Sequence, residues 1–123
     1  MKTTIRLADD GTHVELVRRG EISRQSVLEE NLEAHALGRA HGVRSYLVDH
    51  TEARSVDSLV DQYDFAYHDM RETEGLDQGA RIAVLIAAGD RSHDFIETVC
   101  RNAGFDVQLF TDREAALQFL LGK

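Results

Sequence analysis

The N-terminal segment alternates polar and apolar residues in two short runs, a pattern typical of half-buried β-strands. The runs cover residues 3–7 and 13–17, and in the second run Val14 and Leu16 share one face. Between them lies Asp9-Asp10-Gly11, a turn sequence in which glycine readily adopts a positive φ. We therefore predict a β-hairpin that ends before Gly20, where the alternation stops.

From Ser23 onward the apolar residues recur at helical spacing. Ser23 is a suitable N-cap, and Gly42 is a suitable C-cap because glycine tolerates the left-handed conformation. The predicted helix presents one apolar stripe, formed by Val27, Leu28, Leu32, Ala36 and Ala40. A strand over residues 44–49 follows. A second helix capped by Ser55 comes next, with an apolar face of Val56, Leu59, Val60, Tyr63, Tyr67 and Met70.

The second half of the chain again places each helix after a strand. Residues 82–87 are continuously apolar, which indicates a strand buried on both faces. A helix from Ser92 to Gly104 precedes a strand over residues 105–110. Thr111 and Glu114 fit a capping box at the start of the last helix. The inward faces of these two helices are predicted to hold Phe95, Ile96, Val99, Cys100, Ala103, Ala116, Leu117, Leu120 and Leu121.

This element order, ββαβαβαβα, predicts an α/β layered domain with a mixed five-stranded sheet. Its three β-α-β crossovers are expected to be right-handed. The length of 123 residues suits a single domain, so residues 1–123 are assigned to one unit.

Composition narrows the class of partner and the cellular compartment. The chain has 22 acidic and 14 basic residues and a net charge of −8, which disfavours sequence-independent binding to nucleic acids or anionic membranes. The acidic residues are spread through turns, helix starts and outward faces, as expected for solvation and capping. Cys100 is the only cysteine, and the longest apolar run, residues 82–88, is too short to span a bilayer. We expect a cytoplasmic protein without an integral membrane segment.

Residues 95–107, followed by Phe110 and residues 114–117, resemble the small bacterial SpoIIAA-like proteins, also called STAS/SEC14-type domains. The hairpin, the Gly42-Val43-Arg44 approach to a strand ending at Asp49, and the element order extend this resemblance over the whole chain. The resemblance implies the SpoIIAA-like α/β fold.

The resemblance also implies two functions. In the anti-sigma-factor-antagonist branch, a partner kinase phosphorylates a serine at the start of the helix that follows the Asp-ending strand. Ser55 and Ser58 lie near that place, although the Asp-Ser-Ser-Gly signature of the branch is missing. Relatives in the SEC14-type branch bind apolar ligands between the sheet and the helices.

Response-regulator receiver domains are a competing family of similar length. Asp9, Asp10 and Asp49 imitate their acidic pair and phosphoacceptor. Receivers, however, have a helix between their first two strands, where Gly11 allows only a turn. They also have a lysine after the fifth strand, whereas Phe110-Thr111-Asp112 has none. The sequence therefore disfavours a receiver domain.

Two histidines lie where ligands usually bind in open α/β sheets, beyond the carboxyl ends of the strands. His50 and His93, with Asp49, Asp90 or Asp94, form a candidate acid/base pair or metal site. The alternative is that both are solvated loop histidines, and the chain shows no metal-ligand spacing. The remaining histidines are interpreted as surface or edge residues: His13, His35, His41 and His68.

The second predicted helix concentrates aromatic residues at Tyr63, Phe65 and Tyr67. In one interpretation residues 63 and 67 pack on the sheet and residue 65 meets the following linker. In the other, this helix covers an apolar pocket, or forms a dimer face with Phe65 exposed. Cys100, on an inward stripe, is expected to be a buried, inert thiol.

We interpret the chain as a non-catalytic binding domain for a protein partner or a small apolar or lipid ligand, held between the sheet and the second helix. The candidate ligand-binding residues are Tyr63, Phe65, Tyr67, His50 and His93. The alternative is a regulator phosphorylated at Ser55 or Ser58, and a metal-dependent enzyme or hydrolase at His50 and His93 comes third. We predict no cofactor, no bound metal and no nucleic-acid partner, and a homodimer remains a candidate.

Overall fold

The computed structural model describes residues 2–22, 24–55, 59–65, 68 and 79–122. It confirms the predicted element order. The elements are β1 (Lys2–Leu7), β2 (Val14–Ile22), α1 (Arg24–His41), β3 (Ser45–Ser55), α2 (Leu59–Asp64), β4 (Arg81–Ile86), α3 (Asp94–Asn102), β5 (Asp106–Phe110) and α4 (Arg113–Leu121).

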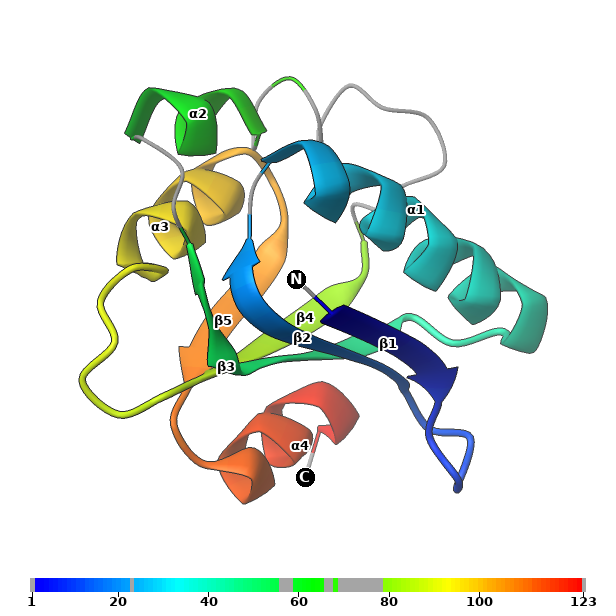
Figure 1. Cartoon of the computed structure of the whole chain (residues 1–123). Helices are drawn as coiled ribbons and strands as arrows, with labels where there is room; N and C mark the ends of the chain where they lie inside the picture. The colour runs from blue at the N-terminus through cyan, green and yellow to red at the C-terminus, as the bar shows by residue number, and fades with distance from the viewer. Residues whose placement is uncertain (1, 23, 56–58, 66–67, 69–78, 123) are drawn as a thin grey trace.

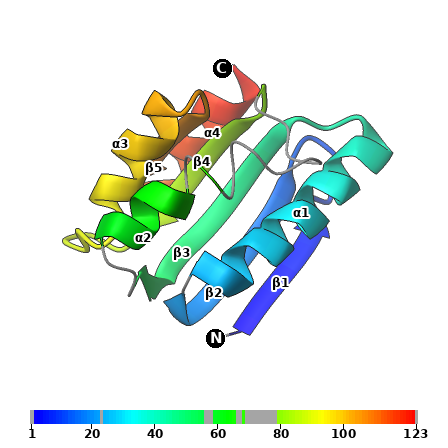
Figure 2. The ribbon, with the colours of Figure 1, turned by 90° about the horizontal axis from the view of Figure 1, so that it is seen from above.

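The described residues form a mixed five-stranded sheet in the order β1-β2-β3-β4-β5. Strands β1 and β2 pair antiparallel as the predicted hairpin, and each later neighbour pair is parallel. Because the parallel strands follow one another in chain order, crossovers of one hand bring every connecting helix to the same face. Helices α1, α2 and α3 cover that face, and α4 covers the other (Figures 1 and 2).

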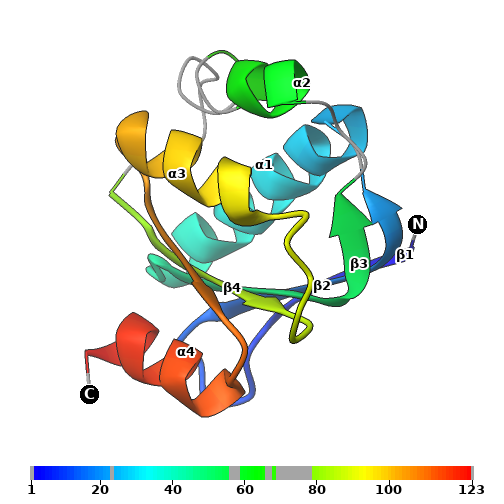
Figure 3. The same cartoon turned by 90° about the vertical axis from the view of Figure 1, so that its left-hand side faces the viewer.

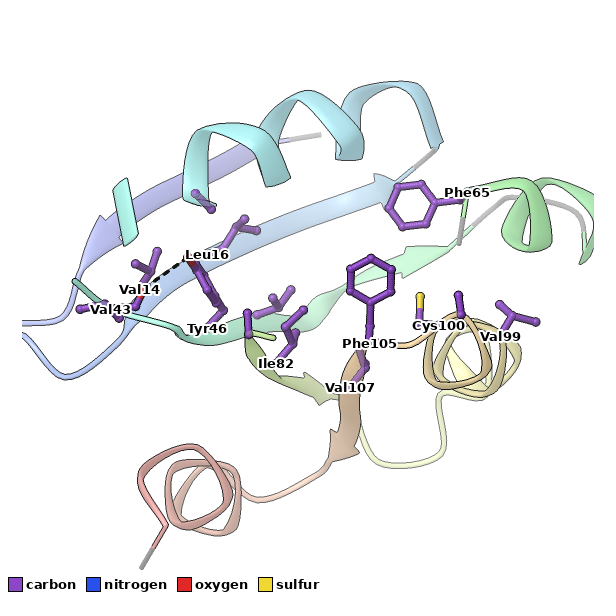
Figure 4. Close-up of a cluster of buried hydrophobic side chains, with 14 residues drawn as sticks. Val14, Leu16, Val43, Tyr46, Phe65, Ile82, Val99, Cys100, Phe105 and Val107 are labelled. Atoms are coloured by element: carbon purple, nitrogen blue, oxygen red, sulfur yellow. Dashed lines mark hydrogen bonds between the residues drawn. The ribbon is translucent and has the colours of Figure 1, made fainter. Parts of the chain in front are cut away.

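Each face of the sheet has its own apolar core. The larger core lies on the side of α1, α2 and α3 and includes Val14, Tyr46 and Phe105 (Figure 4). The smaller core joins Leu47, Ala83 and further residues to α4. Strand β4 contributes Ile82 to the first and Ala83 to the second, which confirms a strand buried on both faces. No helix in the described ranges is long and apolar enough to cross a membrane.

Two strands run further than their sequence patterns predicted. Strand β2 continues through Gly20, which has a φ of 89°, as far as Ile22. Strand β3 continues past Asp49 to Ser55, so the prediction that Ser55 caps a helix is wrong. Pairing between β2 and β3 resumes at Arg19 and Glu52. These extensions are held by the neighbouring strand, an interaction that the local alternation of residue types does not reveal.

The apolar stripe predicted for α1 is partly wrong. Ala36 and Ala40 are exposed, whereas Ala34 and His35 are buried. The buried face of this helix includes polar residues such as His35. Apolar spacing alone therefore predicted a face that is turned about the helix axis from the one that is buried. The last helix is also capped differently, because the Asp112 carboxylate, and not Thr111, accepts hydrogen bonds from the backbone of Glu114 and Ala115.

Candidate functional site

Helices α1, α2 and α3 lie together over one face of the sheet (Figure 3). A cavity of about 120 Å³ is lined by residues of these helices and of the sheet. Apolar side chains from both layers make most of its wall. They include Leu16, Val48, Val84 and Val107 from the sheet and Val27 and Ile96 from the helices. Phe65, just beyond α2, also lines the cavity and is only 8% exposed. Figure 4 shows Phe65 and Phe105 directed into the space between the helices and the sheet.

A buried arginine interrupts this apolar wall. Arg18 on β2 is 2% exposed, and its Nε donates to Glu30 Oε1 at 2.8 Å. Its Nη2 donates to Asn31 Oδ1 at 2.9 Å, and both partners belong to α1. Burial lowers the pKa of Arg18, while the hydrogen bond that Arg18 donates to Glu30 opposes that effect. A guanidinium keeps its charge in proteins, so Arg18 and Glu30 form an ion pair that links the sheet to α1.

His50 on β3 contacts the Arg18 member of this ion pair. Its Nε2 lies 3.2 Å from Nη1 of Arg18. Since a guanidinium can only donate, Nε2 accepts and the imidazole proton resides on Nδ1. Nδ1 is buried and has no hydrogen-bond partner among the described residues. Burial, followed by the charges of Arg18 and His93, lowers the pKa of His50 well below 6.5, so the ring is neutral at pH 7.

A β-bulge lies at His50 and Thr51 of β3, opposite Arg18. The β2–β3 register passes from Val17 opposite Asp49 to Arg19 opposite Glu52, so Arg18 faces both His50 and Thr51. Bulges often re-aim side chains beside functional sites. Tyr46, Val48 and His50 line the cavity by simple alternation along β3. Ser55 lines it as well, although unbroken alternation would turn an odd-numbered residue to the other face, so the bulge brings Ser55 to the cavity side.

The structure brings together the two histidines that the sequence proposed as a pair. The ring centroids of His50 and His93 are 4.9 Å apart. His93, at 1% exposure, places Nε2 3.3 Å from the Ala53 carbonyl oxygen and 3.5 Å from Asp90 Oδ2. Both histidines are buried, so their interpretation as solvated loop residues is wrong.

Of the three carboxylates proposed to join these histidines, Asp90 lies beside His93. Asp49 instead accepts hydrogen bonds from the backbone and hydroxyl of Thr51, and Asp94 pairs with Arg91. Within the described ranges, no group of three or more His, Cys, Asp and Glu side chains is arranged to hold a metal ion.

The other proposed site residues have mixed outcomes. Because Phe65 is buried, the dimer face with Phe65 exposed is wrong. Ser55 is half-buried at the end of β3, and its backbone N–H donates to Ser92 Oγ at 3.2 Å. The side chain of Tyr63, and Ser58 and Tyr67 entirely, lie outside the described residues.

Two histidines expected at the surface are buried. His35 stacks on Tyr46 with ring centroids 4.4 Å apart, and His13 lies 3.1 Å from Glu15 Oε1. His35 finds its partner on another element, β3, whereas His13 contacts its sequence neighbours Thr12 and Glu15. Cys100 is buried as predicted and lines the cavity, and burial raises its pKa to about 12.

Sequence reasoning did not select Arg18 as a site residue, nor Glu30 and Asn31 as its partners. One sequence signal could have identified Arg18. It lies on the same strand face as Val14 and Leu16, and both of these residues are buried. A charged residue in phase with a buried apolar face indicates a buried ion pair or a site.

Comparison of the sequence with protein-family models and with curated proteins finds no match. The structure, however, is similar to that of the anti-sigma factor antagonist SpoIIAA in its unphosphorylated form, with a TM-score of 0.57 at 15% identity. That match covers 99% of this chain and 98% of SpoIIAA. This chain has a SpoIIAA-like fold.

A second SpoIIAA-like structure agrees with this assignment. It is an uncharacterized protein of the DUF3478 family from Shewanella loihica PV-4, with a TM-score of 0.55 and 17% identity over 97% of this chain and 92% of that protein. The SpoIIAA-like fold predicted from the C-terminal third is therefore confirmed. The antiparallel β1–β2 hairpin of this SpoIIAA-like domain also excludes a receiver topology.

The neutral state of His50 predicts a pH-dependent stability. Its folded pKa lies below the ordinary 6.5, so its contribution is fully present above pH 6.5. As pH falls below that value, the unfolded chain takes up a proton that the folded chain does not. Stability should then fall by up to about 1.4 kcal/mol per pH unit. Urea denaturation above and below pH 6.5 should show a steeper loss for the wild type than for His50→Phe. The exposed-site control His41→Phe should keep the wild-type slope, and equal slopes for all three proteins would contradict the prediction.

Proposed function

We propose that this SpoIIAA-like domain is a non-catalytic binding protein that holds a small apolar ligand between the sheet and the α2 region. The observation that carries the proposal is the cavity of about 120 Å³ with its mostly apolar wall. An apolar cavity of about 150 Å³ in another protein stays dry and binds benzene. A ligand about the size of a substituted benzene therefore suits this cavity, whereas a whole lipid exceeds it.

The polar groups of the wall support binding over catalysis. The Nε2 lone pair of His50 is directed to Arg18, and a low pKa makes the ring a weak base. Cys100 has a pKa of about 12, so the thiolate needed for nucleophilic attack is scarce at neutral pH. His93 contacts His50 but is not one of the lining residues, and it directs Nε2 toward a backbone carbonyl and a carboxylate. The two histidines therefore contact other protein groups, and the cysteine is a neutral thiol, an arrangement that suits holding a ligand and not reacting with it.

Titration with ethylbenzene, followed by amide NMR shifts, tests this function. We expect saturable shifts at residues lining the cavity, with a dissociation constant in the micromolar to millimolar range. Ala34→Ile should abolish binding, because Ala34 is buried and lines the cavity. Ala36→Ile, on the exposed face of the same helix, is the matched control and should bind as the wild type does.

Two outcomes would contradict the proposal. One is a wild-type protein that does not respond to ethylbenzene, and the other is undiminished binding by folded Ala34→Ile. If Ala34→Ile fails to fold, Ile96→Phe offers a second way to fill the cavity from α3.

A further inference from the structure

The cavity wall contains a buried hydrogen-bond donor that the rest of the described chain leaves unsatisfied. This donor is Nδ1–H of His50, a residue that lines the cavity and is 7% exposed. Its direction is set by geometry, because Nε2 faces the guanidinium of Arg18 at 3.2 Å and must accept. Buried polar groups in folded proteins are nearly always hydrogen-bonded, so an unsatisfied donor at a cavity indicates a missing partner.

We propose that Nδ1–H of His50 donates a hydrogen bond to an oxygen atom of the ligand, and that the ligand is an uncharged molecule with an apolar body and a carbonyl group. The inference rests on the proposed function and names the chemistry that this cavity selects. The apolar body contacts the aliphatic and aromatic wall, and the carbonyl oxygen meets the imidazole.

The charges around His50 favour a neutral ligand. Arg18 is the one permanently charged residue among the described lining residues, and Glu30 already pairs with it at 2.8 Å. Asn31 accepts a second hydrogen bond from the same guanidinium. His50 itself stays neutral, since a protonated ring would place two cations in contact. A ligand carboxylate would therefore enter an apolar cavity whose cation is already neutralised, which is unfavourable.

Contacts on two sides give His50 a defined orientation. Nε2 meets the guanidinium of Arg18 at 3.2 Å, and the ring lies against that of His93 with centroids 4.9 Å apart. An imidazole fixed on both sides has a fixed direction for its free N–H group. Binding sites that are organised to hydrogen-bond one group discriminate strongly against analogues lacking it.

Three probes of similar size separate the effects of apolar contact, a carbonyl group and a negative charge on affinity. Acetophenone carries the carbonyl, ethylbenzene lacks it, and benzoate carries the charge. We expect the wild type to bind acetophenone roughly tenfold more tightly than ethylbenzene, the usual effect of one added hydrogen bond. Benzoate should bind more weakly than acetophenone. In protein with ¹⁵N-labelled histidine, acetophenone should shift Nδ1 of His50, and ethylbenzene should shift it much less.

His50→Phe should keep ethylbenzene binding and lose the preference for acetophenone. The control is His41→Phe, which replaces an exposed histidine outside the cavity wall and should retain the preference. If His50→Phe does not fold, the ¹⁵N shift in the wild type still decides whether Nδ1 meets the carbonyl.

The outcomes distinguish this inference from the proposed function. Binding of all three probes with equal affinity, or tightest binding of benzoate, would overturn the carbonyl inference while leaving an apolar-ligand site. An acetophenone preference that survives in His50→Phe would also overturn it. Failure of every probe to bind the wild type would refute the proposed function and the inference with it.

Discussion

Glu30→Ala is expected to lower the free energy of unfolding by about 3 kcal/mol, because it leaves a buried guanidinium without its counter-charge. Arg18 is 2% exposed at its side chain and Glu30 is 20% exposed, and the two are 2.8 Å apart. Removing one partner of a buried pair typically costs about 3–5 kcal/mol, and the partial exposure of Glu30 favours the lower end. Asn31 still accepts one hydrogen bond, but it carries no charge.

Urea denaturation of matched variants tests the ion pair. Glu33→Ala removes an exposed carboxylate from the same helix and should change stability by less than about 0.5 kcal/mol. The double variant Arg18→Met/Glu30→Met should recover much of the loss, because apolar replacement of both partners removes the buried charge. Equal effects of Glu30→Ala and Glu33→Ala would refute a contribution from the pair.

Gly38→Ala is expected to destabilise the protein by about 2–3 kcal/mol, the effect of forcing extra volume into a packed site. In an open helix the same change would stabilise by up to about 1 kcal/mol. Here a Cβ atom would overlap Tyr46 Oη and lie 2.8 Å from the carbonyl oxygen of Val43. Gly38 thus lets the C-terminal part of α1 lie directly on β3, next to the stacked rings of His35 and Tyr46.

Thermal and urea unfolding of a small set of variants test this contact. Tyr46→Phe removes the hydroxyl, so Gly38→Ala should cost less in that background, although the Val43 carbonyl remains. Gly42→Ala is the control for backbone conformation, because Gly42 has a φ of 67° and open space around its Cβ position. It should cost about 1 kcal/mol. An unchanged or raised stability of Gly38→Ala would contradict close packing at this position.

Local patterns in the sequence determined the element order and most apolar faces. The uninterrupted run of β4 predicted a strand covered on both sides, and α3 buries Val99 and Cys100 as its spacing indicated. The Asp9-Asp10-Gly11 turn was sufficient to place an antiparallel hairpin at the start of the chain. These features depend on residues close together in the sequence, so periodicity and turn chemistry contain the necessary information.

Tertiary structure decided which polar residues are buried and what they contact. The partners of the Arg18 side chain lie nine, twelve, thirteen and thirty-two positions away along the chain. The bulge opposite Arg18 arises from pairing between β2 and β3, not from a local residue pattern, and it brings Ser55 to the cavity side. The sequence by itself determined the SpoIIAA-like fold and proposed His50 and His93 as neighbours. Only the packed structure decided that both are buried, and that His50 lines an apolar cavity with an N–H group that has no partner among the described residues. Strand register and helix docking set those contacts.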